Sequence, residues 1–211
     1  MSATATANSG SIRDALLEVA LNEFAEHGYA GARIERIVSA ARCNIRMVYH
    51  YFRNKEGLYL AVIDSVFQEL EAKTAQVVPD PEEPLQSLLD TMLFIFDYFD
   101  QHPVVEGLIR AENMAGGRFV AQSTYVHHAA APITDKMRAI IASGTEKGIF
   151  RENIDAVQLY VTMTAIARFH LTNAYSLSAL LNVAMTDESW RQDRRRHIVE
   201  VIEAYVRKPA G

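Results

Sequence analysis

The sequence predicts an all-α protein in which a short helix-turn-helix unit near the N-terminus precedes a longer helical region. Three observations carry this prediction. Apolar residues recur at three- and four-residue spacing along most of the chain, which places them on one face of a helix. No segment alternates apolar and polar residues as a half-buried strand does. Residues 33–55 contain two short helical patterns joined by a tight turn.

Residues 11–27 are predicted to form the first helix, with their apolar side chains on one face. Ser9 or Ser11 is expected to cap its start. Gly28 is expected to end it at the position after the C-cap, where glycine readily takes a positive φ. Residues 1–10 have neither the basic region nor the apolar core of a signal peptide, so we expect a flexible tail.

The two short helices within residues 33–55 are predicted to depend on each other, because a helix this short is not stable alone in water. Asn44 begins the second helix as a favoured N-cap, since its side-chain oxygen accepts an otherwise unpaired backbone N–H. Met47 and Val48 then face inward. The outward side chains of the second helix are Ile45, Arg46, Tyr49, His50 and Tyr51. This arrangement matches a helix-turn-helix whose second helix enters the DNA major groove.

Asn54 is expected to cap a linking helix that runs to about residue 76. Prolines at positions 79, 81 and 84 then exclude a continuous helix and mark a domain boundary. The sequence therefore predicts three parts, which are a tail (1–10), an N-terminal unit with its linking helix (11–76) and a helical C-terminal domain (77–211). The helices expected in the C-terminal domain cover about residues 85–101, 103–116, 119–147, 156–186 and 187–207.

The last two of these helices are expected to bury their apolar residues against protein. Residues 156–186 contain a single charge, Arg168, yet they carry too many polar residues for a lipid-facing span. A helix with so few charges, followed by an amphipathic one, needs a partner surface, and a homodimer provides it. The expected interface residues of the last helix are Ile198, Val201, Ile202 and Tyr205.

The composition suits a globular protein, with 211 residues of which 49% are hydrophobic and 22% charged. The single cysteine, Cys43, excludes an internal disulfide and fits a reducing cytoplasm. The net charge is −5, but six of the seven basic residues in 1–60 lie between positions 33 and 55, where Glu35 is the one acidic residue. An acidic body with a basic tip can bind DNA through that tip.

The residues around the second short helix also resemble a known family. The run Tyr49-x-Tyr51-Phe52-x-x-Lys55-x-x-Leu58 is similar to the end of the DNA-binding domain of the TetR (tetracycline-repressor-like) family of bacterial transcriptional regulators. Ile37-x-x-Ala40-Ala41 and Phe24-Ala25-x-x-Gly28-Tyr29 fit the same pattern, so the resemblance covers roughly residues 11–70. Two places depart from it. Arg42-Cys43-Asn44 replaces the usual Gly-Val-Ser, and Ala32-Arg33 stands where Thr or Ser is usual.

The resemblance implies a ligand-responsive transcriptional regulator, a repressor, that binds a palindromic operator as a homodimer. It also implies a variable helical domain that binds a small effector and dimerises through the last two long helices. The expected DNA contacts are Arg33, Arg36, Asn44, Ile45, Arg46, Tyr49, His50, Tyr51 and Lys55. Arg46 is the expected base reader, because arginine can bond guanine O6 and N7 together. Arg33 and Arg36 are expected to hold phosphates.

Arg168 and His170 are the candidate polar groups of an effector site. A charged and a titratable group within an otherwise uncharged helix must be paired or must face a cavity. Two interpretations remain open, an ion pair between helices or subunits and the recognition of an anionic or polar effector. Candidate neighbours in such a site are Phe96, Tyr125, Met163 and Asn173.

The sequence contains no pattern typical of an enzyme, such as a glycine-rich phosphate loop or a serine elbow, and we expect no metal and no cofactor. His127-His128 is interpreted as surface or pocket histidines. Arg191–Arg196 is interpreted as a salt-bridged surface, with acidic neighbours in the same helix, in preference to a second nucleic-acid patch. Two other functions are weighed: a sensor or enzyme with a vestigial helix-turn-helix, and a helical module that uses residues 33–55 to contact protein.

Overall fold

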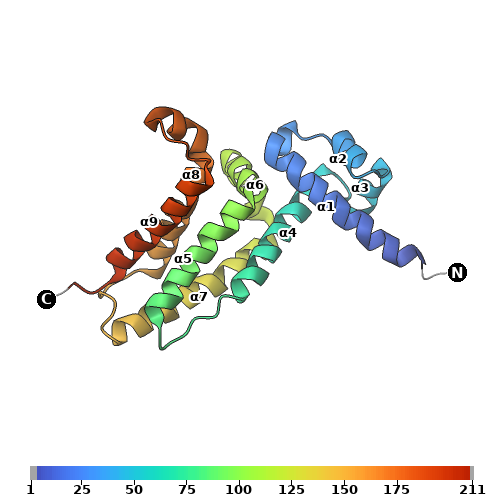
Figure 1. The fold of residues 1–211 in the computed structure, drawn as a ribbon. Helices are drawn as coiled ribbons and strands as arrows, with labels where there is room; N and C mark the ends of the chain where they lie inside the picture. The colour runs from blue at the N-terminus through green and yellow to red at the C-terminus, as the bar shows by residue number, and fades with distance from the viewer. Residues whose placement is uncertain (1–3, 210–211) are drawn as a thin grey trace. The chain divides into compact units, whose positions relative to one another are not determined.

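The computed structural model describes the backbone of residues 4–209 and the side chains of residues 12–123, 125–126 and 132–209. Within that range the chain is helical, and an isolated antiparallel bridge between Phe150 and Arg207 is its only strand-like pairing. The helices are α1 (Thr4–Gly31), α2 (Ile34–Ala40), α3 (Ile45–Phe52), α4 (Lys55–Ala75), α5 (Pro84–Gln101), α6 (Pro103–Met114), η1 (Val120–Gln122), α7 (Thr124–Glu146), α8 (Ala156–Leu181) and α9 (Glu188–Val206). Figure 1 labels the α-helices along the chain. The predicted all-α fold is confirmed.

The chain forms two compact units. Unit 1 contains Met1–Glu71 and Val104–Ala129, and unit 2 contains Ala72–Pro103 and Ala130–Gly211. The division differs from the expected boundary near residue 77, because α6 and η1 pack with the N-terminal helices. Periodicity alone does not tell which helices pack together. The sequence therefore did not predict that residues 104–129 join the N-terminal unit.

The first helix is longer than predicted. It begins at Thr4, so Ser9 and Ser11 lie within α1 and are not its caps, and residues 4–10 are helical where a tail was expected. This stretch has no proline to stop a helix. Gly28 interrupts α1 with φ +64°, as the sequence predicted for this glycine.

The core of unit 1 joins α1, the two short helices and α4. Ile37 of α2 and Val48 of α3 are fully buried, together with Leu16 and Phe24 of α1. An aromatic cluster extends this core, since the ring of Tyr59 lies 4.6 Å from Phe24 and 4.8 Å from Phe119 between ring centroids. The helix-turn-helix therefore packs on α1, and α1 packs on α4 through Phe24 and Tyr59.

A buried carboxylate fixes the returning segment to α4. Glu112 of α6 accepts hydrogen bonds from the backbone amides of Phe119 and Val120, and its other oxygen lies 3.0 Å from the Tyr59 hydroxyl, which donates to it. Burial and this hydrogen bond raise the pKa of Tyr59 well above its ordinary range. Glu112 therefore holds together three segments that lie far apart in sequence.

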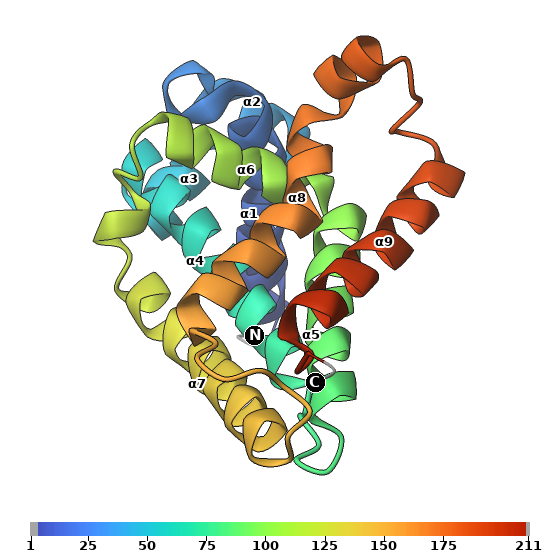
Figure 2. The ribbon, with the colours of Figure 1, turned by 90° about the vertical axis from the view of Figure 1, so that its left-hand side faces the viewer.

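Unit 2 is built on α5, which packs against both α8 and α9 (Figure 1), and Figure 2 shows the same helices from a second direction. The helix α5 is buried on most sides, as its continuous apolar sequence predicted. Asp155 caps α8 by accepting a hydrogen bond from the Gln158 amide at 2.7 Å. No helix in the described part of the chain combines the length and apolar character that crossing a membrane requires.

In the single subunit, α8 buries one face and exposes large apolar side chains on the other, so the expected burial of residues 156–186 against a partner subunit stays a prediction. Ile198 and Ile202 were expected at a dimer interface, but both are fully buried within unit 2. Val201 and Tyr205 are exposed. The sequence defines an apolar stripe on α9, but not whether that stripe meets its own subunit or another.

Candidate nucleic-acid interface

The turn between α2 and α3 is held by local hydrogen bonds. The Cys43 amide donates to the Val38 carbonyl at 3.0 Å, and Arg42 takes a left-handed conformation with φ +51°. The Asn44 side chain accepts from the Arg46 amide at 2.9 Å, which confirms the predicted N-cap of α3. The turn therefore keeps its geometry although arginine occupies a left-handed position that favours glycine.

The outer face of α3 carries the side chains that the sequence assigned to it. Arg46 and His50 are exposed, and Tyr49 has 56% of its surface exposed, while Ile45 and Tyr51 are half-buried. The inner face is anchored by the buried Val48 and Phe52. A guanidinium, an imidazole and two phenol groups thus project from a short helix whose backbone is fixed by packing.

Lys55 begins α4 and packs against the core of unit 1. Its ammonium group is 4.8 Å from the centroid of the Tyr29 ring. Desolvation by burial lowers the pKa of Lys55 below its usual range. The lysine is therefore partly covered by the core of unit 1.

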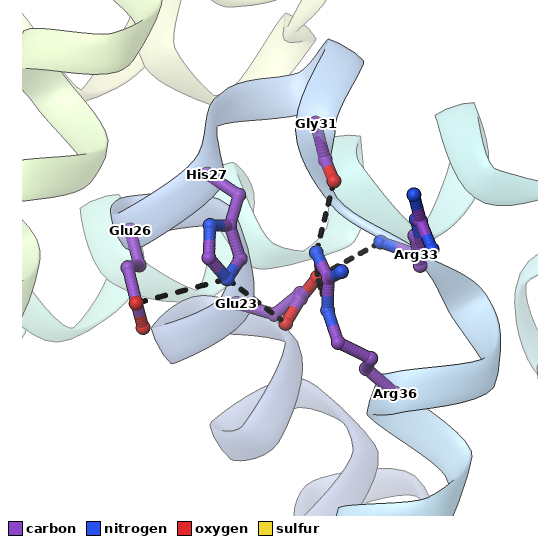
Figure 3. Close-up of polar contacts among 6 residues, drawn as sticks. All are labelled: Glu23, Glu26, His27, Gly31, Arg33 and Arg36. Atoms are coloured by element: carbon purple, nitrogen blue, oxygen red, sulfur yellow. Dashed lines mark hydrogen bonds and ion pairs between the residues drawn. The ribbon is translucent and has the colours of Figure 1, made fainter.

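Glu23 of α1 organises the start of α2, and the sequence prediction missed it (Figure 3). Its Oε1 accepts a hydrogen bond from the Arg33 backbone amide and another from Arg36 Nε, each at 2.8 Å. The Arg36 guanidinium also donates to the Gly31 carbonyl at 2.9 Å. Arg36, expected to hold a phosphate, is therefore engaged within the protein, whereas the Arg33 side chain remains exposed.

The contacts of Glu23 with Arg33 and Arg36 take the place of a capping box at the start of α2. In a capping box, the acid at the third helical position accepts the backbone N–H of the N-cap residue. Here the N-cap is Arg33, which makes no side-chain cap, and the third helical position is Arg36, which has no acceptor. Glu23 reaches across from α1 to supply the missing acceptor, and Arg36 holds its carboxylate in place.

The hydrogen bonds around Glu23 also set its ionisation. Burial would raise the pKa of its carboxyl group, but the hydrogen bonds from Arg36 and from the Arg33 amide outweigh burial and lower it. Glu23 is therefore ionised at neutral pH. A signal for this role existed in the sequence, because Ala32-Arg33 stands where a capping Thr or Ser is usual, so another group had to cap α2.

Two of the residues proposed for an effector site, Phe96 and His170, are in contact. His170 is stacked on Phe96, with ring centroids 5.2 Å apart, and Met163 is buried in the same unit. Asn173 donates to the Phe169 carbonyl of its own helix. Tyr125 belongs to unit 1, where its hydroxyl bonds Glu71.

Arg168 is half-buried, and its guanidinium packs against an aromatic ring. Its guanidinium lies 4.4 Å from the centroid of the Phe99 ring. The side chains of His127 and His128 lie outside the described residues, and the described residues contain no group of three potential metal ligands.

Three of the four arginines of α9, namely Arg191, Arg195 and Arg196, are salt-bridged, as predicted, but partly to acids other than those expected. Arg195 bonds both carboxylate oxygens of Asp97 at 2.7 Å, and Arg191 bonds Asp100 at 3.0 Å, so both reach to α5. Arg196 pairs with Asp193 of its own helix. These pairs tie α9 to α5.

A rigid helix-turn-helix with an exposed, basic second helix, followed by a separate helical unit, defines the class of helix-turn-helix transcriptional regulators. Comparison with known proteins gives the family. Residues 16–62 match the family described as "Bacterial regulatory proteins, tetR family", and residues 81–202 match "Tetracyclin repressor-like, C-terminal domain". The chain belongs to the TetR family, and it is a DNA-binding transcriptional regulator of that family.

Related proteins can be aligned with this chain over most of its length. The transcriptional repressor NicS of Pseudomonas putida is 30% identical over 181 residues, which cover 86% of this chain and 85% of NicS. The transcriptional repressor SCO4008 of Streptomyces coelicolor is 31% identical over 156 residues, covering 73% of this chain and 75% of SCO4008. Among solved structures, SCO4942 of Streptomyces coelicolor is similar with a TM-score of 0.70 and 26% identity, covering 93% of this chain and 99% of that one.

Proposed function

We propose that the protein is a cytoplasmic repressor that binds a palindromic operator as a homodimer and is released from it by a small effector. The observation that carries this proposal is the outer face of α3, where Arg46, Tyr49 and His50 are exposed on a helix fixed from behind by Val48 and Phe52. Arg46 reads a base in the major groove, and Tyr49, His50, Tyr51 and Lys55 contact phosphates or base edges. The repressor role is supported by the names of the two relatives, NicS and SCO4008.

The exposed apolar side chains of unit 2 support a dimer. Phe169, Tyr175 and Leu180 of α8 are more than half exposed, and Val201 and Tyr205 of α9 are also exposed. A folded protein rarely leaves this many large apolar side chains in water unless another surface covers them. A second copy of the chain brings an identical face and gives the two-fold symmetry that a palindromic operator requires.

The helix α4 transmits the effect of effector binding in unit 2 to the DNA-binding unit. Its residues up to Glu71 belong to unit 1, and the remaining turn belongs to unit 2, so one helix is continuous between them. Two recognition helices must be spaced by about 34–36 Å, or a multiple of it, to enter successive major grooves on one side of the duplex. An effector that shifts α4 changes this spacing and prevents both subunits from docking together.

The proposal is tested by a gel-shift experiment with DNA from upstream of the protein's own gene, run at two salt concentrations. We expect a specific complex that is retained against competitor DNA and weakens as salt rises, because phosphate contacts release counterions. A protein that binds no DNA at either concentration would be better explained as an interaction module. Binding without preference for any sequence would leave only a non-specific DNA-binding protein.

A further inference from the structure

A buried histidine in unit 2 lacks hydrogen-bond partners. His170 of α8 has 3% of its surface exposed, and neither ring nitrogen has a partner among the described residues. Its ring is stacked on Phe96 of α5, and the ring of Trp190 of α9 lies 5.6 Å away between centroids. Buried polar groups in folded proteins are almost always paired, so two unpaired nitrogens on one ring require an explanation.

Arg194, one turn after Trp190 on α9, is a basic group whose charge acts on His170. Its Nη2 donates to the carbonyl of Ile166, one turn before His170 on α8, at 3.0 Å. Its Nε is buried and has no hydrogen-bond partner in the described part of the chain. Arg191, Arg195 and Arg196 each have a carboxylate partner, whereas the contact described for Arg194 is a neutral carbonyl.

A half-buried guanidinium does not lose its proton, so it is stable only when its charge is compensated. Asp97 and Asp100, the acids of α5 that face α9, bond Arg195 and Arg191. Desolvation by burial lowers the pKa of Arg194, which agrees with the lack of a carboxylate beside it. An incoming anion would therefore be favoured at this position.

We propose that His170 and Arg194 form the polar end of an effector site for a small aromatic carboxylate, with Phe96 and Trp190 in contact with its ring. The proposal rests on the ligand-responsive function proposed above and names the chemical class of the effector. Arg194 compensates the carboxylate charge, and one nitrogen of His170 donates a hydrogen bond to it. The rings of Phe96 and Trp190, which pack against the imidazole, form the apolar part of this site.

The ionisation of His170 is consistent with this role. Desolvation by burial, and secondarily the charge of Arg194, lower its pKa to about 4. Asp100 acts in the opposite direction and Arg191 in the same direction as Arg194. The imidazole is therefore neutral at neutral pH, with one nitrogen that donates and one that accepts.

The first test uses benzoate and benzamide as probes, because they have the same shape and differ in charge. Calorimetry and thermal unfolding on the wild-type protein should show binding of benzoate and at least tenfold weaker binding of benzamide. Arg194→Met should weaken benzoate at least tenfold, while the control Arg196→Met, at an exposed arginine of the same helix, should not. Equal binding of the two probes, or benzoate binding that Arg194→Met leaves unchanged, would overturn the proposal.

The second test examines His170 directly. The imidazole nitrogen resonances of His170 should shift when benzoate is added to labelled protein, whereas those of the exposed His197 should stay constant. His170→Phe keeps an aromatic ring and removes both unpaired nitrogens, so the free protein should unfold at the same temperature or higher. Unchanged His170 resonances at saturating benzoate would overturn the assignment, and so would a His170→Phe protein that binds benzoate as tightly as wild type.

Inorganic phosphate separates a carboxylate site from a general anion site. It should give no thermal shift that depends on Arg194, and a shift equal to that of benzoate would overturn the aromatic-carboxylate assignment. Failure of the site is distinguishable from failure of the regulator function. A wild-type protein that binds its operator but not benzoate overturns the site alone, whereas one that binds benzoate but no DNA overturns the regulator function.

Discussion

Arg46 is the side chain of α3 best suited to reading a base. It is exposed, and its backbone is fixed by the Asn44 cap. Bidentate bonding to guanine O6 and N7 uses the fork of the guanidinium, which no neighbouring side chain can imitate. Its neighbours Tyr49 and His50 offer single donors that suit phosphate oxygens and carry less sequence information.

We predict that Arg46→Ala costs about 1–3 kcal/mol of binding free energy at the operator and reduces discrimination at one base pair. Fluorescence anisotropy with the operator and with single-base variants measures both effects. An equal loss on every sequence would instead identify Arg46 as a phosphate contact.

Lys55 should behave in the opposite way. Lys55→Ala is expected to weaken binding to all DNA alike and to lower the slope of log affinity against log salt by about one. Because the lysine also packs over the Tyr29 ring, Lys55→Met is the matched control that keeps an apolar stem there. If Lys55→Met binds DNA with the wild-type slope, then packing and not charge explains the loss.

At the scale of an element, α2 depends on a residue outside it. Glu23 accepts the Arg33 amide and holds Arg36, so its carboxylate performs a capping function from α1. We predict that Glu23→Ala lowers the free energy of unfolding by about 0.5–2 kcal/mol, the range for a lost N-cap. It should also weaken operator binding, because α2 carries the turn that leads into α3.

Thermal unfolding and anisotropy on the same variant test this role of Glu23. Glu26→Ala is the control, since Glu26 is exposed three residues after Glu23 and is paired with His27. An equal effect of both variants would show that general charge at the end of α1, and not the cap, is responsible.

The pH dependence of the Glu23 contribution has a defined sign. The pKa of the folded protein's Glu23 is below the ordinary value of 4.5. Its stabilisation is therefore present above that ordinary value and is lost as pH falls through the lower folded value. The stability difference between wild type and Glu23→Gln should be constant near neutral pH and should shrink on acidification. A difference that grows as pH falls would contradict the assignment.

At the scale of the whole molecule, the exposed and buried faces of α8 and α9 decide how dimerisation can be tested. Ile202 has 1% of its surface exposed, so Ile202→Glu would disrupt the subunit itself and report nothing on the dimer. Tyr175 has 86% of its surface exposed in the single chain. It is therefore the better position at which to introduce a charge.

We predict that Tyr175→Glu gives a folded monomer that no longer binds the operator with high affinity, because one half-site provides half of the contacts. Light scattering measures the mass, and circular dichroism measures the helix content. A folded dimer would show that this part of α8 lies outside the interface. Val78→Glu is a control, since Val78 is equally exposed in the loop after α4.

The features that the sequence by itself determined are local. Asn44, Asn54 and Asp155 each cap the helix that follows, and Gly28 interrupts α1. Each of these roles depends on the residue's own side chain and on the next few backbone groups, which the sequence contains directly. The outer and inner faces of α3 were predictable for a similar reason, because helical spacing assigns neighbouring residues to opposite sides.

The tertiary structure alone decided which faces meet. Helical spacing predicted an apolar stripe on α9, but packing placed Ile198 and Ile202 inside the subunit and left Val201 and Tyr205 outside. The structure also pairs residues of different helices that the sequence did not connect, namely Glu23 with Arg36, Tyr59 with Glu112 and Asp97 with Arg195. Periodicity orders side chains around one helix and carries no information about the neighbour. These pairings therefore depend on how the helices pack, which a single sequence does not state.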